Sequence, residues 1–578
     1  MTWLQGPGQE RLTWKTSFEG LLIQIGHIVG LGNMWRFPYF CYKHGGVTFL
    51  IPYGLCSLLM GFPVFFVDIS LGQYLSLGPT NAYASMAPIC LGLGWTMVTM
   101  ALVVSIYYNM ILAWTVYYIS ASFMSPLPWT KCVNDTAQHW CTTGSNSSYL
   151  ASKEYFKNVV LGMSSYSSEP FKLQVHLVVC LAIAWIMVFL CVARGLKRAT
   201  TVVYVTVILP YIIVLLLLAW SYDKMRCEAW LESVTYYFSP SRVRLGKIMD
   251  LEVWVDAISQ VCFSLGFAQG GHITLASYNP FTENTLRNAV IIVLCNAASS
   301  ILYGFLVFSS LTQLANDSPV TIEDVFSGEH KLGSLGVEVA FVAYPVLLGR
   351  VDSTPWSVLF FVMVLALGID TMIVLLETTL TAMFDNFTYL KRMYVPVVIL
   401  VCVIVFLLSL PMCTASGIFI VELFHVYSSR LSTALVVLSK VLVVQYLFGF
   451  KEFIRLLQEE MLVWVPVPMY YYLAFSLSVI TPVFMVCLLV WTIEGEETLI
   501  WRDQVMPDIY RNLGWVFSAA SYFFVPTLAV YAAYRYRGEG WRALFTKTEK
   551  FHPKHILESQ NAGESYVLQD LEVDQTRL

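Results

Sequence analysis

The chain has 578 residues, of which 57% are hydrophobic and only 12% are charged, with a net charge of −4 and a mean hydropathy of +0.65. A soluble protein carries about twice that charged fraction, so the composition indicates a polytopic membrane protein. The small net charge and the lack of a long basic tract give no support to nucleic-acid binding, and no CxxC or HExxH motif supports a metal site.

Twelve apolar segments in the sequence are long enough to span a membrane. They are 19–42, 48–74, 92–123, 173–193, 200–220, 254–281, 286–314, 356–384, 394–411, 418–449, 466–493 and 514–536. Short basic stretches lie between spans at 194–198 and 391–392, and the positive-inside rule places them in the cytoplasm. With twelve spans, we expect a plasma-membrane protein with both termini in the cytoplasm.

One long polar segment carries two signals of the extracellular side. Segment 124–172 contains Cys132 and Cys141 and the glycosylation sequons at Asn134 and Asn146. A short-spaced cysteine pair and sequons are typical of extracellular segments, so we expect a disulfide and glycans there. A second polar segment, 315–355, is also expected outside.

Glycine interrupts two of the spans. The first contains Gly30 and Gly32 with the polar Asn33 and the charged Arg36, and the sixth loosens at 266–271. Glycine weakens a helix, and broken backbone inside lipid is tolerated only where protein buries it or where it lines a cavity. Broken helices at matching places in two halves of a chain are typical of an inverted-repeat secondary transporter with a mid-membrane binding site. The alternative is two kinked helices in another kind of membrane protein.

Three motifs make this interpretation specific: Gly30-Leu-Gly-Asn-Met-Trp-Arg-Phe-Pro-Tyr39, Ser277-Tyr-Asn279 and Gly368-Ile-Asp-Thr371. Together, in order and spacing over nearly the whole chain, they resemble the neurotransmitter:sodium symporter family, and they look most like its neutral amino-acid carriers. That family takes up amino acids, monoamines, GABA and osmolytes with Na⁺ and often Cl⁻. The resemblance implies an all-α membrane protein of twelve transmembrane helices in the LeuT-type fold, a 5+5 inverted repeat with helices 1 and 6 broken.

The resemblance also implies a division of the chain into five parts. They are a cytoplasmic tail 1–18, a first repeat 19–220, a second repeat 221–449, two further spans in 450–536, and a cytoplasmic tail 537–578.

Two sodium sites follow from the resemblance. Asp370 is informative by itself, because a carboxylate inside a span expects a cation; the alternatives are a buried basic partner or a protonated acid. The first site would use the carbonyl of Ile28 and the side chains of Asn33, Ser264 and Asn296. The second would use the carbonyls of Gly26, Val29 and Leu367 and the side chains of Asp370 and Thr371.

A chloride site is implied in the same way. The family uses a Tyr, a Gln, two Ser and an Asn, and this chain offers Tyr53, Gln260, Ser264, Asn296 and Ser300. Hydroxyl and amide donors can replace the hydration shell of an anion without a formal charge. Relatives that work without chloride carry a carboxylate where Ser300 stands, so we expect chloride dependence.

The substrate site is expected at the break in the first span. Relatives that take monoamines carry an Asp in this part of the span, and neither Gly26 nor Gly30 supplies one. The carboxylate of an amino acid would instead face the amides of Leu31 and Gly32 and the hydroxyl of Tyr108. The complete implied pocket is His27, Gly30, Leu31, Gly32, Val104, Tyr108, Phe263, Gly266, Gln269, Thr371 and Leu375.

Two pocket residues depart from the family pattern. His27 stands where an Asn, Tyr or Ala is common, and Gln269 stands where the family usually has an aromatic residue. Both indicate a polar substrate or pH-sensitive uptake, since histidine titrates near neutrality. The alternative is that both side chains face water in an open vestibule.

The family's gates are only partly present. The outer gate pairs the arginine Arg36 with an acid at the start of span 10, where this chain has His425. Further along span 10, Lys440 replaces a usual Glu and needs a partner, for which Glu377 in span 8 is a candidate. The inner gate would use Arg11, Asp385, Trp14 and Tyr278.

These observations predict a symporter that imports a small, neutral amino acid across the plasma membrane with Na⁺ and Cl⁻ by alternating access. The rival is a family member that transports poorly and acts as an amino-acid sensor or a partner-dependent subunit, which the departures at His27, Gln269, His425 and Lys440 suggest. The intact ion ligands argue against the rival.

No nucleophile–base arrangement supports an enzyme, and broken helices in both halves favour alternating access over a channel. The sequence leaves open whether the protein works alone, as a homo-oligomer or with an auxiliary subunit.

Overall fold

The computed structural model describes residues 13–551 and residue 553, except for 131–146, 164–170, 194, 225–226, 239–244, 317–336, 338, 352, 495–499, 502–503, 506–507 and 549–550. Five predicted residues lie outside the described part of the chain: Arg11, Cys132, Cys141, Asn134 and Asn146. The disulfide, the glycans and the arginine of the inner gate therefore stay predictions.

Ten helical stretches in the described residues are long and apolar enough to cross a membrane. They are Val47–Leu75, Pro88–Ala121, Val175–Val192, Val202–Asp223, Thr285–Ser309, Thr354–Asn386, Thr388–Cys413, Gly417–Glu459, Val467–Glu494 and Asn512–Arg535. These ten coincide with ten of the twelve predicted spans. The first and sixth predicted spans do not qualify by length, because each is divided into shorter helices.

The first span breaks at its glycines. Helix α1 (Ser17–Ile28) ends where Val29 leaves the helical conformation, at φ −86° and ψ 78°. The chain resumes as a π-helical turn, Gly32–Arg36, and continues as α2 (Phe37–His44). The structure thus confirms the break that the glycine pattern predicts.

The sixth span breaks in the same way. Helix α13 (Leu251–Ser264) and helix α14 (Gly271–Ala276) flank a non-helical stretch. In this stretch Gly266 and Gly270 have φ values of +60° and +70°, a left-handed conformation that a residue without a Cβ adopts freely.

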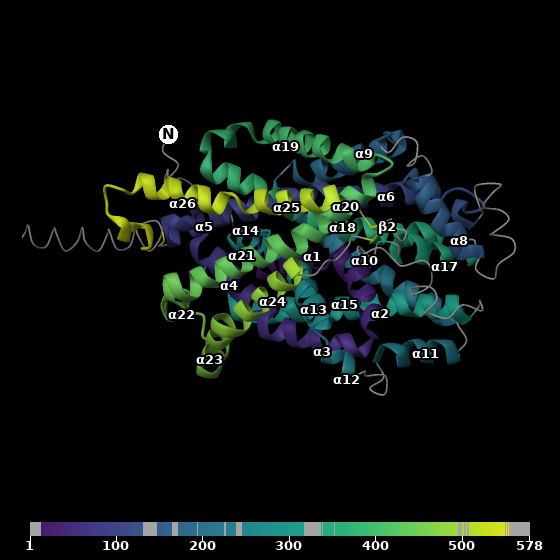
Figure 1. The fold of residues 1–578 in the computed structure, drawn as a ribbon, viewed down its shortest axis with the longest axis horizontal. Helices are drawn as coiled ribbons and strands as arrows, with labels where there is room; N and C mark the ends of the chain where they lie inside the picture. Colours follow the sequence, from purple (N-terminus) through teal and green to yellow (C-terminus); the bar gives the residue numbers. More distant parts are fainter. Residues whose placement is uncertain are drawn as a thin grey trace, which may run out of the picture.

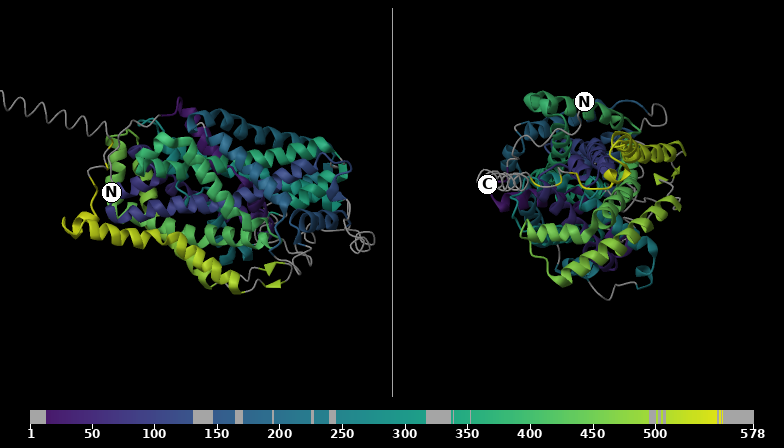
Figure 2. Two further views of the ribbon diagram at one scale, coloured as in Figure 1. Left: turned by 90° about the horizontal axis from the view of Figure 1, so that it is seen from above. Right: turned by 90° about the vertical axis from the view of Figure 1, so that its left-hand side faces the viewer.

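Long unbroken helices surround the two broken spans. Helices α6 (Leu91–Ala121) and α18 (Thr354–Asn386) pack along each other, and α1 packs against α18, α10 (Leu196–Lys224) and α15 (Thr285–Asn316). Helix α14 packs on α18 and on α4 (Phe62–Leu75), and α13 packs on α3 (Val47–Cys56). Most of these helices follow the long axis of the molecule (Figure 1), and the end-on view in Figure 2 shows them gathered into one bundle.

The described part of the chain contains further helices. They are α5 (Pro79–Met86), α8 (Ser147–Glu154), α9 (Val175–Val192), α11 (Cys227–Phe238), α12 (Leu245–Ile248), α17 (Tyr344–Val351), α19 (Tyr394–Ser409), α20 (Gly417–Tyr427), α21 (Thr433–Leu442), α22 (Phe450–Glu459), α23 (Val467–Phe475), α24 (Thr481–Glu494), α25 (Asp508–Tyr522) and α26 (Phe524–Arg535). Strands β1 (Ile500–Trp501) and β2 (Gln504–Val505) form a short antiparallel hairpin.

Helix α9 presents apolar side chains to its surroundings. On α9 the side chains of Val175, Val179, Ile183, Ile186 and Leu190 are exposed. Their spacing places them on one face of the helix. Such a stripe is costly in water and natural in lipid. The fold is that of a multi-pass membrane protein whose broken helices lie inside the bundle.

Candidate ion and substrate site

Asn33 joins the first broken helix to α13 and α15. Its Nδ2 donates to Oδ1 of Asn296 at 2.7 Å and to Oγ of Ser300 at 2.9 Å. The last residue of α13, Ser264, donates to the same Asn296 oxygen at 2.8 Å and to Oδ1 of Asn33 at 3.3 Å. The three side chains predicted for the first sodium site are therefore in mutual contact and buried.

The predicted chloride residues continue this network. The hydroxyl of Tyr53 lies 3.3 Å from Oγ of Ser300, and Nε2 of Gln260 donates to the carbonyl of Gly32 at 3.3 Å. All five predicted side chains are buried. The five side chains offer hydroxyl and amide donors and no carboxylate, which suits the binding of an anion. The oxygens of Ser264 and Asn296, which belong to both predicted sets, suit the binding of Na⁺ in the adjoining first sodium site.

Asp370 on α18 faces the first span, as the second sodium site requires. A Cβ added at Gly26 would lie 3.3 Å from its Oδ2. Its Oδ1 accepts a hydrogen bond from the hydroxyl of Thr206 on α10, which is not among the predicted site residues. The side chain is only 3% exposed, and no basic side chain forms an ion pair with it in the part of the chain that the structure describes. Leu367 and Val29 are buried nearby along the same elements.

Tyr108 occupies the break in the first span. Its hydroxyl accepts a hydrogen bond from the amide of Leu31 at 3.1 Å and donates to Oγ1 of Thr371 at 3.3 Å. Thr371 also donates to the carbonyl of His27 at 3.4 Å. A Cβ on Gly30 would lie 2.7 Å from Oγ1 of Thr371 and 3.0 Å from the tyrosine hydroxyl, so this position needs glycine. The structure thus brings together the predicted backbone amide, tyrosine and threonine of the substrate site.

Phe263 forms one wall of the same region. A Cβ on Gly32 would lie 2.8 Å from its ring, while the predicted pocket residues Val104 and Leu375 are buried on α6 and α18. The guanidinium of Arg36 lies 4.8 Å from the centre of the Phe263 ring, and the ring of His425 lies 5.0 Å from it. The phenylalanine therefore contacts both predicted residues of the outer gate.

Arg36 and His425 do not pair as the outer gate requires. Arg36 donates to Oγ of Ser259 at 2.8 Å, to the Ser259 carbonyl at 3.2 Å and to Oε1 of Gln260 at 3.4 Å. Nε2 of His425 has no hydrogen-bond partner among the described residues. Among the described residues, the hydrogen bonds of Arg36 therefore go to α13 and not to His425.

A buried ion cluster nearby joins the first, sixth and tenth spans. Asp256 on α13 is 1% exposed and accepts from Lys43 at 2.7 Å, from His44 at 2.8 Å and from Arg430 at 3.3 Å. Lys43 and His44 end α2, and Arg430 lies in the π-helical turn Ser428–Ser432 after α20. An acid on span 6 thus faces a base on span 10, with charges reversed relative to the predicted gate. Asp256 lies within the sixth predicted span, and none of the four residues of this cluster is among the predicted site residues.

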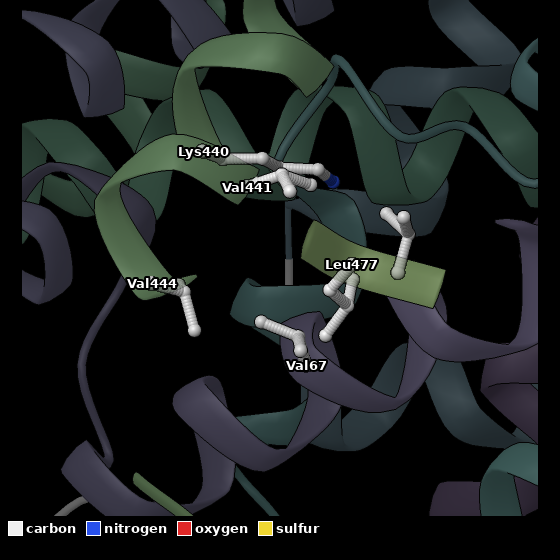
Figure 3. Close-up of a pocket in the computed structure, with 6 residues that line it drawn as sticks. Val67, Lys440, Val441, Val444 and Leu477 are labelled. Carbon is white, nitrogen blue, oxygen red and sulfur yellow. The ribbon is translucent and has the colours of Figure 1, made fainter. Parts of the chain in front are cut away.

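The partner of Lys440 is Asp68, and the candidate Glu377 is wrong. The Lys440 ammonium on α21 donates to Oδ2 of Asp68 on α4 at 2.5 Å and to the carbonyl of Phe267 at 3.0 Å. Glu377 instead accepts from the hydroxyl of Tyr278 at 3.4 Å. The stem of Lys440 lines an apolar pocket, shown in Figure 3, with Val64, Val67, Val441, Val444 and Leu477.

Two residues of the predicted inner gate are in contact. The amide of Trp14 donates to the carbonyl of Tyr278 at 2.9 Å, and the two rings lie 5.5 Å apart. Oδ2 of Asp385 accepts from the amide of Gly78 at 3.2 Å. The partner predicted for Asp385, Arg11, lies outside the described residues.

Comparison with known families agrees with this geometry. The model of the sodium:neurotransmitter symporter family matches residues 11–536. The chain belongs to the sodium:neurotransmitter symporter family. Membership implies the LeuT-type fold, and it identifies the protein as a member of a transporter family and not as an enzyme.

Several members of the sodium:neurotransmitter symporter family are similar along almost their whole length. The sodium- and chloride-dependent neutral and basic amino acid transporter B(0+) of Mus musculus is 33% identical over 562 residues, covering 90% of this chain and 85% of the relative. The Homo sapiens protein of that name is 31% identical, covering 96% and 91%. The sodium- and chloride-dependent glycine transporter 1 of Xenopus laevis is 32% identical, covering 92% and 86%.

Proposed function

We propose that this protein is a Na⁺- and Cl⁻-coupled symporter that imports a small, neutral amino acid across the plasma membrane by alternating access. The observation that carries the proposal is the hydrogen-bonded network of Asn33, Ser264, Asn296, Ser300 and Tyr53, which adjoins the break in the first span. Relatives named as sodium- and chloride-dependent amino-acid transporters support it.

In the proposed cycle, each ion is cargo held by the chain's own polar groups. The first Na⁺ takes the oxygens of Asn33, Ser264 and Asn296 with the Ile28 carbonyl, and the second takes Asp370 and Thr371 with the carbonyls of Gly26, Val29 and Leu367. Chloride takes the donors of Tyr53, Gln260, Ser264, Asn296 and Ser300. Since these sets draw on several helices, ion binding favours the state in which the helices are together.

The substrate carboxylate would take over the amide of Leu31 from the hydroxyl of Tyr108. That hydroxyl contacts both the amide and Thr371, so a small rotation lets it donate to the carboxylate instead. The end of a broken helix offers free amides and favours a negative charge. Because Gly30 leaves no carboxylate at this point, a monoamine would lack a partner for its ammonium group.

The test is uptake of a panel of radiolabelled amino acids into cells that express the protein, in NaCl, choline chloride and sodium gluconate. We expect saturable uptake of at least one small, neutral amino acid that disappears without Na⁺ and falls without Cl⁻. No uptake of any amino acid, with the protein labelled at the cell surface, would contradict the proposal and favour the rival of a sensor or partner-dependent subunit.

The observation that favours the rival is that, among the described residues, Arg36 bonds to Ser259 and Gln260 and not to His425. The cluster around Asp256 weakens it, because Asp256 and Arg430 supply an ion pair between span 6 and span 10 near the place where the family gate would act. Such a pair can break and re-form as the two groups of helices rock.

The geometry of the cluster predicts which of its side chains uptake depends on most. Asp256→Asn takes the carboxylate away from Lys43, His44 and Arg430, of which Lys43 also pairs with Glu252 at 2.7 Å, whereas Arg430→Gln leaves Asp256 in contact with Lys43 and His44. We expect Asp256→Asn to reduce uptake at least about tenfold, because it removes the buried carboxylate that three basic side chains share, and Arg430→Gln to reduce it less. Uptake normalised to surface protein measures this, and an equal or larger loss in Arg430→Gln would contradict it.

The chloride set makes a second prediction. Ser300→Glu places a fixed negative charge beside Asn33 and Tyr53, where the anion is proposed to bind. We expect uptake by this variant to lose most of its dependence on Cl⁻ when chloride is replaced by gluconate. Ser300→Ala is the matched control, since it removes the hydroxyl without adding a charge and should remain chloride-dependent. Full chloride dependence of Ser300→Glu would argue against the anion site.

A further inference from the structure

Three polar atoms converge on Gly266, in the break of the sixth span. A Cβ added to this glycine would lie 3.2 Å from Oε1 of Gln269, 3.5 Å from Nε2 of His27 and 3.6 Å from Nε2 of His272. The two histidine rings lie 5.0 Å apart, and all three side chains are more than nine-tenths buried. We call His27, Gln269 and His272 the polar trio. His272 follows the break on α14, and nothing in its sequence context separates it from an ordinary span residue.

Most of the polar atoms of the trio lack partners. Among the described residues, Nδ1 and Nε2 of His27, Oε1 of Gln269 and Nδ1 of His272 have no hydrogen bond. Nε2 of His272 bonds to the carbonyl of Leu265. A buried polar atom left without a partner costs about 1–3 kcal/mol. Two of these unpartnered atoms, Nε2 of His27 and Oε1 of Gln269, lie near Gly266, and they indicate a group that enters the site and supplies the missing bonds.

The chemistry of the trio defines that group. Because Nε2 of His272 faces a carbonyl, it carries the proton, and Nδ1 is left as an acceptor. Oε1 of Gln269 is a second acceptor, and neutral His27 offers one donor and one acceptor in either tautomer. The trio therefore matches a ligand that both donates and accepts. A hydroxyl or a carboxamide does so, an aliphatic group does neither, and a carboxylate cannot donate.

The trio adjoins the proposed substrate site through His27. The carbonyl of His27 accepts from Thr371, which contacts Tyr108. On its other side, the His27 ring lies against the second break, since a Cβ on Gly271 would be 2.6 Å from its Nε2. A substrate held at its carboxylate by Leu31 and Tyr108 can thus extend its side chain toward Gly266.

We infer that the polar trio is a subsite for the side chain of the transported amino acid. It selects small amino acids with a hydroxyl or carboxamide over aliphatic ones of the same shape. His272 is then a specificity-determining residue. The inference rests on the proposed symport of a small amino acid and adds its substrate class.

The test compares amino acids of equal shape that differ in the polar group. Threonine against valine and asparagine against leucine are such pairs, each measured as a competitor of radiolabelled uptake. A site built to hydrogen-bond its ligand discriminates strongly against the analogue that lacks the polar group. We expect threonine and asparagine to compete at concentrations at least about tenfold lower than valine and leucine, which corresponds to one good hydrogen bond.

Variants assign the preference to the trio. His272→Phe keeps a ring and removes both nitrogens, and Gln269→Met keeps the length and removes the amide. We expect that in each variant threonine and valine compete with radiolabelled uptake at nearly equal concentrations. His176→Phe is the matched control, because His176 bonds to the carbonyl of Val160 and lies outside the trio. It should keep the preference of the unmodified protein. If the His272→Phe protein fails to reach the cell surface, the Gln269→Met variant alone tests whether the preference for threonine over valine depends on the polar trio.

Failure of the subsite can be told apart from failure of symport. Thermal stabilisation of the purified protein in NaCl by threonine and valine needs binding but no transport. Stabilisation by threonine alone, without cellular uptake, would support the subsite and contradict symport. Uptake with equal competition by both members of each pair, or an unchanged ratio in both variants, would overturn the subsite and leave symport standing. The trio would then hold water only.

Discussion

Lys440→Met should strongly destabilise the protein, because it leaves Asp68 as an unpaired charge in apolar surroundings. The side chains of Lys440 and Asp68 are 1% and 3% exposed, and valine and leucine side chains surround the lysine stem. Removing one partner of a buried pair costs about 3–5 kcal/mol, since the remaining charge stays desolvated. We expect a large loss of surface protein and a clearly lower midpoint of thermal unfolding in detergent.

Three further variants test this explanation. Asp68→Asn should destabilise in the same way, while Lys440→Met combined with Asp68→Asn should recover part of the loss, because no charge is then buried. Arg455→Met is the matched control: Arg455 pairs with Glu452 at 2.7 Å, but its side chain is 55% exposed. Such a pair contributes about 0–1 kcal/mol. Equal unfolding midpoints for Lys440→Met and Arg455→Met would contradict the role of the buried pair.

The same lysine also reaches the broken sixth span. Its ammonium donates to the carbonyl of Phe267 and lies 4.8 Å from the centre of the Phe267 ring. One side chain on span 10 thereby holds a free carbonyl in the break beside Gly266. In the sequence, Lys440 is a departure from the family pattern that puts transport in doubt. In the structure, it pairs with Asp68 and bonds to the broken sixth span.

Asp370→Asn should sharply weaken the dependence of uptake on sodium. Asparagine has the same size and can still accept from Thr206, so the change removes little except the charge. A carboxylate is the strongest attraction that a cation can find inside a span. We expect the Na⁺ concentration for half-maximal uptake to rise at least about tenfold, equivalent to about 1.4 kcal/mol.

Thr206→Val is the control for this variant. It removes the hydrogen bond to Asp370 and keeps the charge, so it should change the sodium requirement much less. Titration of uptake with NaCl at constant ionic strength, with choline as the replacing cation, measures both variants. An unchanged sodium requirement in Asp370→Asn would exclude Asp370 from the second site.

Local properties of the sequence determined the membrane class, the positions of the unbroken spans and both helix breaks. Hydropathy acts on each segment by itself, and a residue without a Cβ loosens its own helix, so neither needs a partner elsewhere. The family resemblance, which rests on local motifs, indicated Asn33, Ser264, Asn296 and Ser300, and the structure places these side chains in contact.

Only the tertiary structure decided which charges and polar groups face one another. Lys440 and Asp68 are 372 positions apart, and their pairing depends on which faces of two helices meet. The same holds for Asp256 with Arg430, for Phe263 with Arg36 and His425, and for His272 beside His27. A charged side chain inside a membrane needs a partner, so the sequence predicts that one exists. Its identity is a property of helix packing, which no single segment contains.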